Sequence, residues 1–192
     1  MIDSLEMFRE KIEKKAVYKE FGLKKHEYGL ITLHRPSNVD EQNKLKTLCQ
    51  LLCRIAGKIP LIFPIHPRTR KNLINYGLIN VLNGFGNIVL LEPLSYVRFM
   101  NLVFNCCLVI TDSGGIQEET SYLGIPCLTL RSNTERPVTI LQGTNQLCEI
   151  SDIVMKVDKI LSNNICLGSQ IEFWDGKTAA RIVESIESRI NC

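Results

Sequence analysis

A segment from Leu108 to Leu123 holds the residues best suited to binding an anion. A short apolar run is followed by Asp112 and Ser113, then by Gly114 and Gly115, and then by a helix-forming stretch. This order predicts a strand, a tight turn and a helix N-terminus, where backbone N–H groups and the helix dipole favour a bound anion. Ser113 is suited to cap the helix, and the two glycines would let a bulky group approach the backbone closely. The segment therefore predicts an anion site, although the same residues could serve only to cap and turn the chain.

The helix that follows carries two adjacent glutamates, for which we expect different roles. At about 100° per residue, a helical wheel places Thr120 and Leu123 beside Ile116, on the side that faces the sheet. Glu118 then points towards solvent, whereas Glu119 lies about 60° from the buried stripe. We therefore expect Glu119 at the edge of a crevice and Glu118 outside it.

Composition excludes several classes of protein. The chain has 192 residues, of which 45% are hydrophobic and 22% charged, as expected for one globular domain. A net charge of +3 is too small to predict binding to nucleic acid or to a membrane surface. No apolar run approaches the roughly 20 residues that span a bilayer, and the first residues do not form a signal peptide. We expect a cytoplasmic protein.

The eight cysteines predict buried thiols rather than disulfides or a metal site. Cys106, Cys107 and Cys127 lie in or beside apolar runs, where a thiol behaves as a small hydrophobic group. Cys49 and Cys53 share a helix face, but no second Cys or His pair is placed to complete a zinc site. We therefore expect eight reduced thiols, no metal and no cofactor.

Apolar strand-like runs alternate with helical segments along the chain. We expect strands at residues 28–33, 61–65, 88–91, 108–111, 127–130 and 146–150. We expect helices in a lead-in over 1–25, after Asp40 as a cap, after His66, and over 95–105, 114–123, 151–161 and 176–190. The last helix carries one apolar stripe formed by Ala179, Ile182, Val183, Ile186 and Ile190. This alternation predicts an α/β fold with a doubly wound parallel sheet.

Polar and basic residues follow the predicted strands at their carboxyl ends, where such sheets bind ligands. The residues at these ends are His34, Arg35, His66, Arg68, Asp112, Ser113, Arg131, Thr134, Glu135 and Arg136. Each basic residue alone could be a solvated surface charge. Together, beside a helix N-terminus, they predict a diphosphate site in which Glu119 accepts hydrogen bonds from sugar hydroxyls. The residues therefore predict a nucleotide or nucleotide-sugar site.

Five motifs are more specific than this general pattern. They are T-L-H-R-P-S-N-V-D from Thr32, I-H-P-R-T from Ile65, T-D-S-G-G-I-Q-E-E from Thr111, T-E-R-P-V-T from Thr134 and G-T-N-Q-L from Gly143. In this order the motifs resemble the non-hydrolysing UDP-N-acetylglucosamine 2-epimerase family, and W-D-G-K-T-A-A-R-I-V from Trp174 resembles its C-terminal helix. The resemblance implies reversible interconversion of UDP-GlcNAc and UDP-ManNAc, by elimination of UDP to a glycal and its re-addition on the opposite face of C2.

The resemblance covers one of the family's two Rossmann-like domains. The family has a glycosyltransferase-B fold, and residues 1–192 resemble its second domain, with I-D-S-L near the start resembling the segment after the domain crossover. The family carboxylates proposed for proton transfer at C2 lie mostly in the first domain. We therefore expect an excised domain, a truncated product or half of a split enzyme that works with a separate N-terminal chain, and a homo-oligomer is a further expectation. We also expect this chain alone not to epimerise UDP-GlcNAc.

The resemblance also implies roles in binding UDP and UDP-N-acetylhexosamine. Glu119 would hold the ribose hydroxyls, and Ser113 with the amides of Gly114 and Gly115 would bind the diphosphate. Phe99 would pack against uracil, although it could equally be an ordinary core aromatic.

The remaining roles concern the departing UDP and regulation. His34 would approach the leaving oxygen, and Arg136 would supply charge as UDP departs. His66 would help to bind a second, activating UDP-GlcNAc, but Arg68 stands where the family more often has Asn. Arg35 would orient the loop after the first strand through a carboxylate.

Three other functions are compatible with parts of this pattern. A glycosyltransferase-B donor domain uses a similar helix N-terminus and ribose-binding glutamate, but the T-E-R-P and H-R-P-S-N motifs argue against it. A hydrolysing epimerase is disfavoured by the T-E-R-P-V-T and G-T-N segments. A non-catalytic nucleotide-binding or partner-binding module remains a third alternative.

Overall fold

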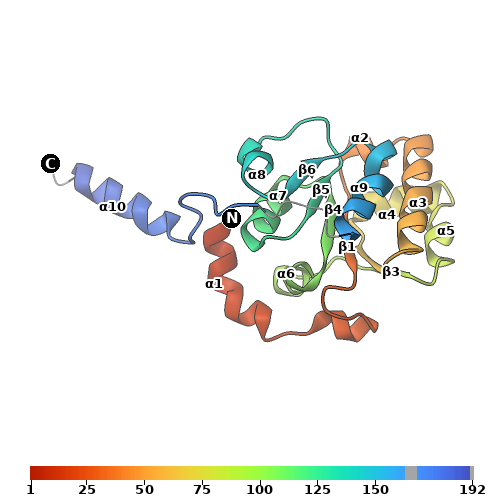
Figure 1. Ribbon diagram of the computed structural model, residues 1–192, viewed down its shortest axis with the longest axis horizontal. Helices are drawn as coiled ribbons and strands as arrows, with labels where there is room; N and C mark the ends of the chain where they lie inside the picture. The colour runs from red at the N-terminus through yellow and green to blue at the C-terminus, as the bar shows by residue number, and fades with distance from the viewer. Residues whose placement is uncertain (163–167, 191–192) are drawn as a thin grey trace.

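The computed structural model describes residues 1–162 and 168–190. Its centre is a parallel sheet with the strand order β3-β2-β1-β4-β5-β6, shown in Figure 1. The strands are β1 Gly29–Thr32, β2 Leu61–Pro64, β3 Ile88–Leu91, β4 Leu108–Thr111, β5 Cys127–Thr129 and β6 Asn145–Leu147. The order reverses direction between β1 and β4, so the predicted doubly wound α/β fold is confirmed.

Helices cover both faces of the sheet. The helical elements of the described residues, of which α10 does not pack on the sheet, are α1 Ile2–Glu13, η1 Val17–Phe21, α2 Pro36–Val39, α3 Gln42–Ala56, α4 Pro67–Asn75, α5 Ile79–Asn83, α6 Tyr96–Asn105, α7 Gly114–Leu123, α8 Pro137–Leu141, η2 Ile150–Asp152, α9 Ile153–Leu161 and α10 Thr178–Ile190. Proline occupies the first turn of α2, α4 and α8, where its missing N–H is not needed. Gly124 ends α7 in the left-handed conformation at φ 69°, which turns the chain into β5.

Each face of the sheet has its own hydrophobic core. Leu61 and Phe63 of β2 face a core built with α3, α4, α5 and α9, whereas Ile62 between them faces a core built with α1, η1, α6 and α7. Successive side chains of a strand point to opposite faces, and both faces are covered. The strands therefore read as continuous apolar runs in the sequence.

The predicted helical lead-in over residues 1–25 consists of two elements, α1 and η1, which are separated by a break. The buried amide of Asn101 on α6 supports this break. Its Oδ1 accepts a hydrogen bond from the backbone N–H of Val17 (2.8 Å), and its Nδ2 donates to the carbonyl oxygens of Ile12 and Lys15 (both 2.9 Å). The break thus depends on a residue more than 80 positions away in the chain.

Two further boundaries differ from the predictions. Asp40 does not cap α3: it follows α2, and its carboxylate pairs with Arg68 through Nε (2.8 Å) and Nη2 (2.5 Å). Strand β6 begins at Asn145 and ends before residue 150, because the chain turns into η2 after Cys148 donates its N–H to the Thr129 carbonyl (2.8 Å).

Helix α10 extends away from the rest of the structure in Figure 1. Its apolar stripe is exposed, with relative exposures of 53% for Ile182, 52% for Val183 and 51% for Ile186. The start of the helix is tied to α1, because the N–H of Ala179 donates to Asp3 Oδ2 (2.7 Å). The predicted stripe therefore exists, but it packs on neither core.

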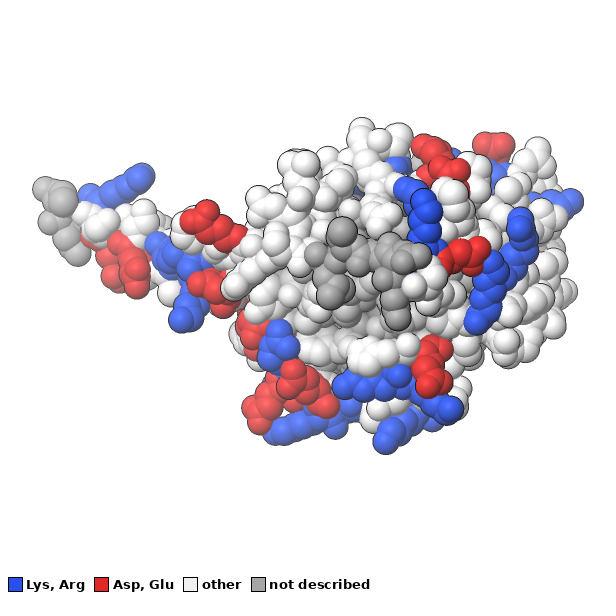
Figure 2. Space-filling model, viewed as in Figure 1, with Lys and Arg blue, Asp and Glu red and all other residues white. Residues whose placement is uncertain are grey.

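The surface carries mixed charge. On the face shown in Figure 2, Lys and Arg side chains are interspersed with Asp and Glu rather than gathered in one basic patch. Within the described residues, no helix has the length and hydropathy needed to cross a membrane. The six cysteines in this part of the chain are unpaired, while Cys166 and Cys192 lie outside the described residues.

Candidate functional site

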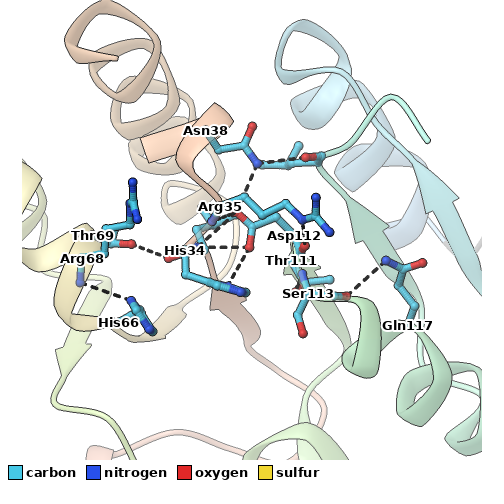
Figure 3. Close-up of polar contacts among 12 residues, drawn as sticks. His34, Arg35, Asn38, His66, Arg68, Thr69, Thr111, Asp112, Ser113 and Gln117 are labelled. Carbon is cyan, nitrogen blue, oxygen red and sulfur yellow. Dashed lines mark hydrogen bonds and ion pairs between the residues drawn. The ribbon is translucent and has the colours of Figure 1, made fainter. Parts of the chain in front are cut away.

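The residues predicted at the ends of the first and fourth strands meet where β1 and β4 end side by side, at the point where the strand order reverses. Figure 3 shows His34 and Arg35 after β1 facing Asp112 and Ser113 after β4. A crevice outside the carboxyl ends of the strands at such a switch point is the usual ligand site of an open α/β sheet. The position of the site is thus set by the topology.

Asp112 is the buried centre of this site, with a relative exposure of 0%. Its carboxylate accepts hydrogen bonds from the backbone N–H groups of His34 (3.1 Å) and Arg35 (2.9 Å) and from Asn38 Nδ2 (3.1 Å). Burial raises the pKa of Asp112, but hydrogen bonds from His34, Arg35 and Asn38 outweigh burial and hold the pKa below its usual value. Asp112 therefore ties the loop after β1 to the end of β4.

His34 contacts the same carboxylate through its ring. Nδ1 of His34 lies 3.0 Å from Asp112 Oδ1, and the hydrogen bond to Asp112 raises the pKa of His34 despite partial burial. The ring of His66 lies next to that of His34, with 5.4 Å between ring centroids. His66 precedes α4, and its Nδ1 accepts a hydrogen bond from the backbone N–H of Arg68 (3.2 Å). The two histidines are therefore neighbours at one rim.

The N-terminus of α7 borders this site. Ser113 occupies the N-cap position, but its side chain makes no capping hydrogen bond. A Cβ atom on Gly114 would lie 4.0 Å from Glu135 Oε2, whereas one on Gly115 would lie 2.8 Å from the terminal methyl of Met1. Gly114 thus faces an anionic group, and the close approach at Gly115 is made by Met1.

The two glutamates of α7 are both more enclosed than the helical wheel predicts. Glu119 has a relative exposure of 2%, accepts a hydrogen bond from the Tyr96 hydroxyl (2.9 Å), and has a pKa raised by burial. Glu118 does not point freely to solvent: its Oε1 lies 2.8 Å from Arg136 Nε, in an ion pair without hydrogen-bond geometry. The wheel gave the direction of each side chain but not what covers it.

Phe99 lies on α6 and is half-buried against the core that contains α1 and α7. This packing is what an aromatic residue at the edge of the core would show. The alternative role, contact with a base, would use its remaining exposed edge.

The loop after β5 brings further charge to α7. Arg131 has a side-chain exposure of 5% and makes two hydrogen bonds to Glu135, of 2.8 and 2.6 Å. Arg35 Nη2 lies 3.6 Å from the same carboxylate, and the Arg131 guanidinium lowers the pKa of Glu135 to about 2. Two arginines and one glutamate therefore meet beside Gly114.

A buried polar network holds this loop in place. Gln117 Oε1 on α7 accepts hydrogen bonds from the Thr134 hydroxyl (2.5 Å) and from Asn145 Nδ2 (3.1 Å). Asn145 also donates to the Thr139 hydroxyl (3.1 Å) and accepts from the Thr129 hydroxyl (2.6 Å). Thr134 and Asn145 of the sequence motifs thus position the loop that carries Arg131, Glu135 and Arg136.

Gly143 lies next to this network, and replacing it by alanine is expected to destabilise the fold. A Cβ atom there would lie 2.6 Å from the Thr139 carbonyl oxygen and would also collide with the Ser121 hydroxyl. Overpacking of this kind typically costs about 1–3 kcal/mol. Urea denaturation should give a lower midpoint for Gly143→Ala than for the wild type. Gly86→Ala is the matched control, since nothing lies within 4 Å of its Cβ position, and equal midpoints for the two variants would contradict the packing argument.

Comparison with known proteins agrees with this geometry. The family model for UDP-N-acetylglucosamine 2-epimerase matches residues 1–187. The chain is 40% identical over 181 residues to the UDP-N-acetylglucosamine 2-epimerase of Methanococcus maripaludis, covering 92% of this chain and 49% of that protein.

Solved structures give the same result. The UDP-GlcNAc 2-epimerase of Methanocaldococcus jannaschii in complex with UDP-GlcNAc and UDP is similar to this chain with a TM-score of 0.84 at 35% identity. That match covers 97% of this chain and 52% of the solved chain. The enzyme of Neisseria meningitidis bound to UDP-GlcNAc gives a TM-score of 0.81 at 28% identity, covering 97% of this chain and 53% of that one.

The chain spans about half the length of the relatives it matches. The matched half contains the carboxyl ends of β1 and β4, the N-terminus of α7 and the loop after β5. From its motifs, its fold and these matches, the chain belongs to the UDP-N-acetylglucosamine 2-epimerase family.

Proposed function

We propose that this chain is a UDP-binding domain that holds a UDP-N-acetylhexosamine and stabilises its diphosphate as UDP departs during 2-epimerisation. The observation that supports this most directly is the meeting of His34, Arg35 and the N-terminus of α7 at the switch point of the sheet. Cations, oriented N–H groups and a helix dipole in one place stabilise charge that develops on a leaving phosphate. Binding of UDP-GlcNAc and UDP by the related M. jannaschii enzyme supports the same ligand class.

We assign the individual roles from the resemblance to the family, and the positions of the side chains support them. The amides of Gly114 and Gly115 bind the diphosphate. The Ser113 hydroxyl binds it as well, because Ser113 makes no capping hydrogen bond with its side chain. Glu119 accepts hydrogen bonds from the ribose hydroxyls after the Tyr96 hydroxyl gives way. His34 donates towards the oxygen that leaves the sugar.

Other residues would act at the margins of this site. Arg136 exchanges its contact with Glu118 for the phosphates, and Phe99 offers its exposed edge to uracil. His66, next to His34, would contact a second nucleotide-sugar.

The removal of the C2 proton requires groups outside this site. The resemblance to the family assigns that step to carboxylates of an N-terminal domain, which lies beyond the half that this chain matches. We propose that such a domain, as a separate chain or as a longer version of this one, completes the enzyme, and that the assembly forms a homo-oligomer. We place it in the cytoplasm, because the unpaired thiols of the described residues suit a reducing compartment.

Titration calorimetry with UDP and UMP tests the proposal. Millimolar UDP should give saturable heat and raise the melting temperature, and UMP should bind more weakly because it lacks the second phosphate. Ser113→Ala should weaken UDP binding several-fold, roughly the net contribution of one or two hydrogen bonds. Because Ser113 makes no capping bond, this variant should melt like the wild type. Absence of both heat and thermal shift with millimolar UDP would show that the assignment of the site is wrong.

A further inference from the structure

We propose that Asp112 is a positioning residue that holds His34 as an imidazolium, so that the Nε2–H group of His34 donates to the diphosphate. The inference rests on the proposed function, because it concerns the same site. It assigns a role to a carboxylate that lies beneath the site and contacts the ligand only through His34.

The surroundings of Asp112 make His34 its one ionisable cation partner among the described residues. The other donors to the carboxylate are neutral: two backbone N–H groups and the amide of Asn38. The guanidinium of Arg35 is near, but its Nε donates to the backbone carbonyl of Asp112 (3.1 Å) and not to the carboxylate. Hydrogen bonds and a partner of opposite charge both stabilise a buried carboxylate as an anion, and His34 Nδ1 at 3.0 Å is placed to be that partner.

This contact decides which hydrogen-bonding group His34 presents to a ligand. An ionised carboxylate is only an acceptor, so Nδ1 of His34 must carry a proton. In neutral His34 the other nitrogen, Nε2, is then a bare acceptor that repels phosphate oxygens. Only the imidazolium has Nε2–H as a donor. Within the described residues, no group accepts a hydrogen bond from Nε2, and the side chain is 40% exposed.

The groups that face His34 have opposite effects on its pKa. Asp112 raises the pKa of His34, first through the hydrogen bond and also through its charge, whereas partial burial and Arg35 lower it, with a net increase. His66, the N-cap residue of α4, faces the ring, and Glu135 from the loop after β5 pairs with Arg35. Since the pKa is raised, His34 stays protonated at pH values where an isolated histidine would lose its proton. The donor at Nε2 is therefore lost only when the pH rises through the raised pKa.

Imidazole NMR of the ligand-free protein tests the pairing directly. The His34 resonances are identified by their loss in His34→Gln and followed from pH 5 to 10. We expect a midpoint above the ordinary histidine value of about 6.5 and, at high pH, ¹⁵N shifts of the Nδ1–H tautomer. In Asp112→Asn the midpoint should move to lower pH. Asn38→Ala disturbs the same loop but keeps the carboxylate, so its midpoint should stay above that of Asp112→Asn.

A wild-type midpoint at or below about 6.5, or an Nε2–H tautomer, would overturn the proposal. This measurement needs only the wild type and His34→Gln, so it remains decisive if Asp112→Asn does not fold.

Binding of UDP at different pH values tests the consequence for the ligand. The ratio of wild-type to Asp112→Asn affinity cancels the titration of UDP itself. We expect the ratio to be smallest at pH 5.5 and to increase towards pH 7.5, up to roughly tenfold, the effect of one charged hydrogen bond, because the variant loses the His34 proton at a lower pH than the wild type does. A ratio that stays constant across this range would indicate a merely structural role for Asp112 and would overturn the proposal. If the wild type binds no UDP at any pH, the proposed function fails, while the NMR titration still decides the Asp112–His34 pairing.

Discussion

Glu119→Ala is expected to reduce UDP affinity by about a hundredfold or more. The carboxylate of Glu119 is almost fully buried, and we propose that it accepts hydrogen bonds from two ribose hydroxyls. A hydrogen bond to a charged group contributes about 1.5–3 kcal/mol, so the loss of two such bonds exceeds a factor of one hundred. Titration calorimetry with UDP measures the loss.

The neighbouring glutamate provides the matched control. Glu118→Ala removes the partner of Arg136 but no group that we assign to the ribose, so its effect on UDP affinity should be much smaller. Equal losses in the two variants would contradict the assignment of Glu119. Glu119→Gln tests whether a loss of affinity could result from unfolding. Burial raises the pKa of Glu119, so its ionised form is unfavourable in the folded protein. Glu119→Gln should therefore not lower the melting temperature at pH 7.

Tyr96→Phe should keep or increase UDP affinity, since the Tyr96 hydroxyl donates a hydrogen bond to the Glu119 carboxylate in the structure.

The second large effect concerns the chemical step. In D₂O, the purified 192-residue chain is expected to incorporate no deuterium at C2 of UDP-GlcNAc above background. General acid–base catalysis typically contributes about 10²–10⁴-fold and requires a group within hydrogen-bond reach of the transferred proton. Tight binding of the UDP half cannot replace that group, because affinity shared by substrate and transition state does not increase the rate of the chemical step.

Proton NMR of UDP-GlcNAc follows the exchange, with the M. maripaludis relative as the positive control. Exchange that appears only after an N-terminal domain is added would support the proposal that this domain removes the C2 proton while the present chain binds UDP. Exchange by this chain alone, abolished in His34→Ala, would mean that the C2 proton is handled by residues of this half. Persistent absence of exchange with such a domain, together with intact UDP binding, would favour the non-catalytic nucleotide-binding module.

The sequence was sufficient to predict the sheet because its signals are local. Six apolar runs separated by helical segments leave few topologies other than a parallel, doubly wound sheet, and the polar residues after β1 and β4 then meet at one rim. The start of α7 after Ser113 was predictable for the same reason, since the residues that favour a turn and a helix N-terminus are adjacent in the chain.

The details that the sequence did not predict depend on contacts between distant segments. A helical wheel fixes the angle of Glu119 around α7, but it does not show that Tyr96 of α6 lies against Glu119 and donates a hydrogen bond to its carboxylate. Arg136 reaches Glu118 from a different loop, and Asn101 stabilises the break before η1. The contacts of Asp112 were also missed, and their one local sign was an acidic residue directly after a strand-like run that ends in Thr111.

The pairing of Glu135 with Arg131 and Arg35 bears on how the affinity for nucleotide depends on ionic strength. In the structure these guanidinium groups already have an anion of the chain's own beside the N-terminus of α7. A diphosphate that reaches them must displace this carboxylate, so binding is an exchange of one anion for another. Such an exchange changes the local charge less than binding to two unpaired arginines would. Added salt screens the arginine pairs with Glu135 and those with the diphosphate alike. The affinity for UDP should therefore fall only gradually as the salt concentration increases.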